Sequence, residues 1–230
     1  MNLSDQRKQW HEALTDGMTR EVLQRDTDRF LHQALSTPCL DVLASSDGVQ
    51  LTSLAGKTYI DFHGNNVHQV GFSHPVILRR ITEQLGQLSF STRRYTNEPA
   101  IRFAEKLASL LPSDLNRVLL TPNGSSAVGM ALKLARAVTG KFKVVSFWDA
   151  FHGASLDAIS VGGEAVFREY MGPLMPGVER VPPPVTYRGI FEGREEKCLE
   201  YLEYVFSREN DIGVFIITRM SWGFIKSRRA

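Results

Sequence analysis

The sequence predicts an α/β protein built on a parallel sheet, with a helical arm and a small antiparallel β element ahead of it. Two short strand patterns, at 118–120 and 144–147, flank a helical pattern at 125–138. A strand, a helix and a strand in this order form a right-handed crossover in a parallel sheet. A further apolar run at 212–217 predicts one more buried strand. With 230 residues and 43% apolar composition, the chain can bury a core of this kind.

The first part of the chain predicts the arm and the β element. Apolar residues, beginning with Trp10 and Leu14, recur at a spacing near four within residues 1–35. This spacing predicts an amphipathic helix or two. Short β-rich runs follow at 49–51 and 59–62, separated by glycine and aspartate breaks. Runs of this kind are typical of a small antiparallel sheet.

From Pro75 onward the apolar pattern has a helical period. It predicts one helix around 77–85 and a second helix from 101 that stops at Pro112. The helix at 125–138 ends at a glycine, as helices commonly do. After a proline-rich loop, an apolar stripe over 198–206 predicts another helix.

Charge and cysteine content exclude several classes of protein. The 27 Lys and Arg residues nearly balance the 25 Asp and Glu residues, giving a net charge of +2, so neither nucleic acid nor an anionic membrane is an expected partner. Cys39 and Cys198 are far apart and lack the spacing of metal or redox sites. The chain begins without an apolar signal segment and contains no run of membrane-spanning length. We therefore expect a cytoplasmic protein.

Two other site types can be excluded from spacing. The sequence at 56–58 is glycine, lysine and threonine, but a P-loop would also require glycine at position 51, where leucine stands. His63, His68 and His74 follow one another at intervals of five and six residues, which match no common zinc site. We expect no nucleotide loop and no metal.

The segment 121–127 lies between the predicted strand at 118–120 and the following helix, and it predicts a phosphate-binding turn. Gly124 lets the backbone approach a ligand closely, and Ser125 adds a hydroxyl donor. The free N–H groups and the dipole at a helix start favour an anion. Asparagine, glycine and serine are equally typical of an ordinary turn and helix cap, so this alternative stays open from the segment alone.

A second group follows the strand at 144–147. Phe151, His152 and Gly153 belong to the block 149–153 just after this strand, and ligands of open α/β sheets collect at the carboxyl ends of strands. Both loops should therefore open onto the same rim, where an aromatic ring beside a phosphate site suits a planar phosphorylated cofactor. The alternative is that Phe151 belongs to the core and His152 is a hydrogen-bonded loop histidine.

Several further blocks occur together with these two loops. In sequence order, the blocks are Asp47-Gly48, Tyr59-Ile60-Asp61-Phe62, Gly71-Phe72-Ser73-His74-Pro75, Asn123-Gly124-Ser125-Ser126-Ala127, Ala131-Leu132-Lys133-Leu134-Ala135-Arg136, Thr139-Gly140, Phe151-His152-Gly153 and Val181-Pro182. In this order and spacing they resemble the class III aminotransferases, pyridoxal-phosphate enzymes of fold type I. The similarity covers about residues 40–217 and looks closest to the ammonia-lyases that act on a hydroxy-aminoethylphosphonate.

The resemblance implies roles for individual residues. Gly124 and Ser125 would hold the phosphate of pyridoxal 5'-phosphate, Phe151 would stack on its pyridine ring, and His152 would belong to the same cofactor site. The segment 63–65 would lie near the substrate entrance. Ser126 stands where the family usually has glutamate, which changes the local contacts and bears on the substrate class.

The resemblance also implies a domain organisation. Residues 1–74 would form the arm and part of the small domain, and residues 75–217 the first half of the large pyridoxal-phosphate domain. Residues 218–230 form a tail that does not match. The expected fold is a three-layer α/β/α sheet that lacks its later strands. The full-length form would be a homodimer acting on a small amino compound, by transamination or by elimination of ammonia.

The family's chemistry also requires a lysine for the Schiff base and an aspartate at the pyridine nitrogen, and both lie beyond the matched text. Lys226 follows the last predicted strand but lacks a Gly-rich turn after it. We expect no catalytic residue in this chain and interpret it as an inactive N-terminal fragment, most simply explained by a frameshift. The alternative is a non-catalytic subunit that pairs with a full-length homologue.

Overall fold

The computed structural model divides the chain into two compact units, residues 1–102 and 103–230. The residues that it describes are 9, 12–13, 16–31, 41–64 and 67–218. Several predicted features lie outside these residues: Trp10 and Leu14 of the arm, Cys39, Asn65, and the tail from 219 onward with Lys226. Among the described residues, no helix has the length and apolar character needed to cross a membrane.

The first unit contains a capped helix, α2 (Gly17–Arg29), within the range predicted for the arm. The carboxylate of Asp16 accepts a hydrogen bond of 2.7 Å from the backbone N–H of Thr19. Such a cap satisfies one of the N–H groups that a helix start leaves without an internal partner. Thr19 and Leu23 are its buried residues.

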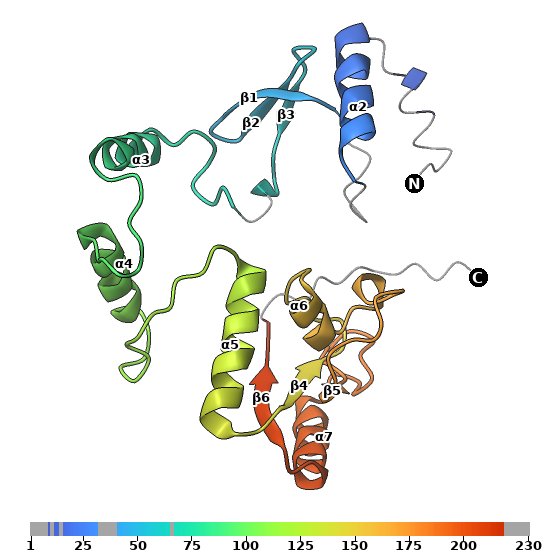
Figure 1. The fold of residues 1–230 in the computed structure, drawn as a ribbon. Coiled ribbons are helices and arrows are strands. Elements are labelled where there is room, and N and C mark those ends of the chain that lie inside the picture. Colours follow the sequence, from blue (N-terminus) through green and yellow to red (C-terminus); the bar gives the residue numbers. More distant parts are fainter. Residues whose placement is uncertain (1–8, 10–11, 14–15, 32–40, 65–66, 219–230) are drawn as a thin grey trace. The chain divides into compact units, whose positions relative to one another are not determined.

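The predicted antiparallel element is confirmed. It consists of β1 (Leu43–Asp47), β2 (Gln50–Ser53) and β3 (Thr58–Ile60), in the order β1-β2-β3 (Figure 1). Gly48 makes the tight turn between β1 and β2 with a φ of 54°, a conformation that side chains disfavour.

The two helices predicted after Pro75 also form. They are α3 (Pro75–Gln87) and α4 (Glu98–Ala108), and α4 ends ahead of Pro112. Pro75 starts α3, a position where its missing N–H breaks no helical bond. The apolar side chains of Ile77, Ile81 and Leu85 remain exposed.

The second unit contains a three-stranded parallel sheet. Its strands are β4 (Lys143–Phe147), β5 (Val178–Val181) and β6 (Ile212–Ile216), in the order β5-β4-β6. The strands predicted at 144–147 and 212–217 are therefore confirmed. The strand β5 was not predicted, because Glu179 and Arg180 interrupt its apolar pattern.

The predicted strand at 118–120 is wrong. These residues have no strand structure, and Leu119 is 69% exposed. A strand needs a neighbour to satisfy its backbone hydrogen bonds, and among the described residues 118–120 pair with none of the three strands of this sheet. The predicted crossover thus lacks its first strand, although its helix and its second strand both form.

Helices cover both faces of the sheet. α5 (Gly124–Thr139) and the short α6 (Leu156–Val161) lie on one face, where Leu132 and Val161 pack with Val144. α7 (Glu195–Arg208) covers the other face, where Cys198 and Leu202 pack with Val145. Neighbouring strand residues point to opposite faces, so Val144 and Val145 of β4 pack against the helices on opposite faces of the sheet. The predicted α/β/α layering is confirmed.

The helix α5 has the ends that its sequence predicts. Gly140 closes it in the left-handed conformation, with a φ of 67° and its N–H bonded to the carbonyl of Arg136.

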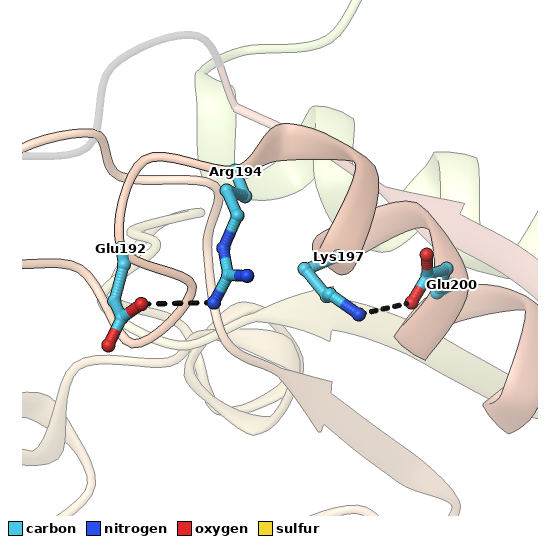
Figure 2. A network of polar contacts seen from close by, with 4 residues as sticks. All are labelled: Glu192, Arg194, Lys197 and Glu200. Carbon is cyan, nitrogen blue, oxygen red and sulfur yellow. Dashed lines mark hydrogen bonds and ion pairs between the residues drawn. The ribbon is translucent and has the colours of Figure 1, made fainter.

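At the start of α7, two exposed ion pairs join Glu192 to Arg194 and Lys197 to Glu200 (Figure 2). Exposed pairs of this kind contribute little to stability, so the core described above carries the fold.

We expect Val145→Ala to lower the free energy of unfolding by about 2 kcal/mol, because it removes two methyl groups from a fully buried site and leaves a cavity. Val138→Ala on α5 is the matched control, since Val138 is 77% exposed and should change stability by less than about 0.5 kcal/mol. Urea unfolding followed by circular dichroism measures both. Equal effects of the two substitutions would contradict the assigned core.

Candidate cofactor site

The start of α5 leaves two backbone amides free for a ligand. The side chain of Asn123 accepts a hydrogen bond of 2.9 Å from the N–H of Ser126, and its carbonyl accepts one from Ala127. The amides of Gly124 and Ser125 have no partner among the described residues. A Cβ added at Gly124 would meet nothing within 4 Å. The predicted phosphate-binding turn therefore faces open space with two unused donors at the positive end of a helix.

The loop after β4 contacts this turn directly. The backbone N–H of Ala154 donates a hydrogen bond of 3.2 Å to Oγ of Ser125. Gly153 packs on the same residue, since a Cβ added there would lie only 3.0 Å from Cα of Ser125. Its φ of 131° is also a conformation that side chains rarely adopt. The expectation that the two loops share a rim is confirmed by this contact.

Phe151 lies at the entry to the contacting loop and is half-buried. Its ring packs against that of Phe167, with centroids 4.8 Å apart and a tilt of 47°. Phe167 belongs to the short 3₁₀ helix η2 (Ala165–Phe167), which sequence reasoning did not identify. Phe151 therefore lies between the two alternatives. Its ring packs on another aromatic ring, as a core residue does, but part of it remains exposed.

His152 is only 9% exposed, and its Nε2 atom has no hydrogen-bond partner among the described residues. Burial lowers the pKa of its imidazole, because the charged form loses its hydration. The imidazole is therefore neutral near pH 7. The alternative of a hydrogen-bonded loop histidine would require a partner for Nε2, and the described residues supply none. Buried polar atoms usually have a partner, so Nε2 of His152 is an exception among the described residues.

A half-buried carboxyl group near the end of β4, that of Glu164, was missed at the level of sequence. Burial, together with the charge of Asp149, raises the pKa of Glu164. Its Oε1 atom has no partner among the described residues. No sequence signal could have identified it, because its surroundings depend on how the loop after α6 folds back.

His63 and His68, two of the three histidines considered for a metal site, take part in local contacts. Amides of His63 and Gly64 donate to the carboxylate of Asp61 at 2.8 and 3.0 Å, which lowers the pKa of Asp61. The ring of His68 packs on Phe72 at 4.1 Å. Across the described residues, no group of three or more histidine, cysteine, aspartate or glutamate side chains is placed to hold a metal ion.

The residues of the second unit fit a phosphorylated flat ligand. Two free amides and a helix dipole suit an anion, and the Ser125 hydroxyl still has its proton to donate, because it accepts the bond from Ala154. Phe151 offers part of an aromatic surface one loop away, and His152 offers an unpartnered nitrogen.

Comparisons with known proteins agree on one family for this chain. The profile of the aminotransferase class-III family matches residues 33–219. An (R)-1-hydroxy-2-aminoethylphosphonate ammonia-lyase from Vibrio splendidus is 54% identical over 94% of this chain and 49% of its own length. An acetylornithine aminotransferase from Methanopyrus kandleri is 36% identical over 61% of this chain and 36% of its own length.

The fold agrees with this family. A taurine:2-oxoglutarate aminotransferase from Bifidobacterium kashiwanohense, solved in complex with PLP and glutamate, superposes with a TM-score of 0.77 at 24% identity. The match covers 86% of this chain and 47% of that one. The expected fold type I architecture is confirmed, and the matches cover 36% to 49% of these relatives' own lengths. This chain belongs to the class III aminotransferase family.

Proposed function

We propose that this chain is the phosphate-binding half of a pyridoxal-phosphate enzyme. The observation that carries the proposal is the contact between Ser125 and the loop at 153–154. This contact brings a helix start with two free amides next to the loop that carries Phe151. A helix start alone is common, but a helix start joined to an aromatic loop suits a phosphate ester on a flat ring.

Each site residue then has one task. The amides of Gly124 and Ser125, with the Ser125 hydroxyl, hold the phosphate. Phe151 covers the pyridine ring, supported from behind by Phe167. His152 stays neutral and uses its Nε2 atom to contact the bound molecule. When bound, pyridoxal 5'-phosphate supplies an electron sink for reactions at an amine-bearing carbon.

The proposed substrate class is a small amino compound. Similarity to the Vibrio splendidus ammonia-lyase favours elimination of ammonia from a hydroxy-aminophosphonate, with transamination as the alternative that the acetylornithine enzyme supports. We propose that residues 1–74 form the arm and part of the small domain, and residues 75–217 the first half of the large domain. The Schiff-base lysine and the aspartate for the ring nitrogen would come from sequence outside this chain, which by itself would be inactive. The full-length form would be a cytoplasmic homodimer.

A second candidate function is a non-catalytic subunit that pairs with a full-length homologue. The exposed apolar side chains of Ile77, Ile81 and Leu85 on α3 favour it, because apolar faces of this kind commonly become buried in an interface. Co-expression of the tagged chain with its full-length homologue distinguishes the two functions. Recovery of a stable mixed dimer would support the subunit role, and separate elution would remove it.

We expect the chain to bind pyridoxamine 5'-phosphate, an analogue of the cofactor that cannot react with surface lysines, and to bind unphosphorylated pyridoxamine far more weakly. Gly124→Val should weaken binding of the phosphorylated analogue by about tenfold or more, because the new side chain would fill the open space in front of the free amides. Fluorescence titration measures both affinities.

Gly17→Val is the matched control. Gly17 is likewise the first residue of a capped helix with nothing within 4 Å of an added Cβ, so this variant should bind as tightly as the parent chain. Equal affinity for pyridoxamine and its phosphate, or an unaffected Gly124→Val variant, would contradict the phosphate-binding role.

The buried neutral imidazole of His152 makes stability depend on pH. Its pKa in the folded state lies below the ordinary value of 6.5, so the unfolded chain takes up a proton that the folded chain resists. The free energy of unfolding should therefore fall as the pH drops below about 6.5. His152→Gln, which cannot titrate, should show a smaller loss between pH 7 and pH 5 in thermal unfolding. An identical pH profile for both chains would show that His152 is not a buried neutral group.

A further inference from the structure

Gly129 occupies an unfavourable position for glycine, in the interior of the 16-residue helix α5. Glycine destabilises a helix interior relative to alanine, because it has more backbone freedom to lose. The space beside it is occupied: a Cβ added at Gly129 would overlap Oδ2 of Asp157, so that side chain would have to move. The side chain of Asp157 therefore lies directly against the backbone of α5.

Asp157 is held in this orientation by its other oxygen. Oδ1 accepts hydrogen bonds from Oγ of Ser155 at 2.5 Å and from the backbone N–H of Ala158 at 2.9 Å. An acidic residue in the first turn of α6 is favourable for the helix dipole on any face. That benefit would not require a glycine on the neighbouring helix, so the contact with Gly129 is a separate feature.

The contact at Gly129 repeats the one at Ser125. Ser125 and Gly129 are four residues apart in α5 and therefore lie on the same face, one turn from each other. Their partners, Ala154 and Asp157, are three residues apart at the end of the loop that carries Phe151 and His152. The loop and the start of α6 thus contact α5 at two points, by a hydrogen bond at Ser125 and by close packing at Gly129.

We propose that Asp157 is a positioning residue for the cofactor site: seated over Gly129, it holds the 151–154 loop against the start of α5 and so fixes Phe151 relative to the phosphate-binding amides. The effect on the cofactor rests on the proposed function, but the contact between the 151–154 loop and α5 does not depend on a ligand. Asp157 acts by its shape and its hydrogen bonds, and it does not touch the bound molecule.

Amide hydrogen exchange of the full chain without ligand tests the attachment. Asp157→Ala should raise the exchange rate of the Ala154 amide, which donates to Oγ of Ser125, by about tenfold, the effect expected when this one hydrogen bond is loosened. Asp157→Asn keeps the shape and the acceptor oxygen, so it should retain the slow exchange. Unchanged exchange in Asp157→Ala would overturn the proposal.

A double-mutant cycle tests whether Gly129 and Asp157 act as a pair. Gly129→Ala should speed exchange in the loop of the parent chain, yet have no further effect in a chain that already carries Asp157→Ala. Gly86→Ala in α3 is the matched control, since an added Cβ there meets nothing within 4 Å, and it should leave the loop unchanged. Additive effects of Gly129→Ala and Asp157→Ala would overturn the proposed pairing.

Ligand binding separates positioning from general loss of structure. In Asp157→Ala, affinity for pyridoxamine 5'-phosphate should fall about tenfold through loss of a fixed ring contact, while affinity for inorganic phosphate should be unchanged, because the amides of Gly124 and Ser125 remain. An equal loss for both ligands would show a merely structural role and overturn the positioning inference. If the parent chain binds neither ligand, the proposed function fails, and the exchange experiment still decides the attachment.

Discussion

The site depends on one close contact between two backbone segments, Ser125 at the start of α5 and Gly153-Ala154 in the loop after β4. The contact requires glycine at 153, because the φ of 131° and the proximity of Ser125 both exclude a side chain. The amides of Gly124 and Ser125 remain free, because Asn123 accepts hydrogen bonds only from the two amides that follow them. A helix start with two free amides and the loop that carries Phe151 therefore lie side by side.

The sheet is what brings these segments together. β4 occupies its centre, and its adjacent residues Val144 and Val145 are both fully buried, one facing α5 and the other facing α7. The loop at 151–154 leaves the carboxyl end of this strand, where ligands of parallel sheets gather. The position of the loop is thus fixed by a core that contains no functional residue, and the functional residues need to be arranged only at its edge.

Elements with strong local signals could be predicted from the sequence. α5 has its apolar period, its cap at Asn123 and its closing Gly140, and each of these is a property of neighbouring residues. β5 could not be predicted, because its Arg180 donates hydrogen bonds to the carbonyls of Gly162 and Ser160, at the end of α6. Such a partner makes a charged residue acceptable inside a sheet, and no local pattern reveals it. The strand predicted at 118–120 shows the converse: its apolar residues favour a strand locally, but in the structure they pair with no other strand.

The residues of the candidate site likewise include some that the sequence could predict and some that it could not. Order along the chain was enough to identify Gly124, Ser125, Phe151 and His152. It could not identify Phe167, Glu164 and Asp157, because their relation to the site comes from folding of the segments after the loop.

The most direct test of the central claim is an amide NMR titration of the chain with pyridoxamine 5'-phosphate. The account predicts that the largest shifts fall on Gly124, Ser125 and Ala154, and that pyridoxamine without phosphate leaves Gly124 and Ser125 unmoved. Shifts confined to other segments, or the same shifts with both compounds, would contradict it.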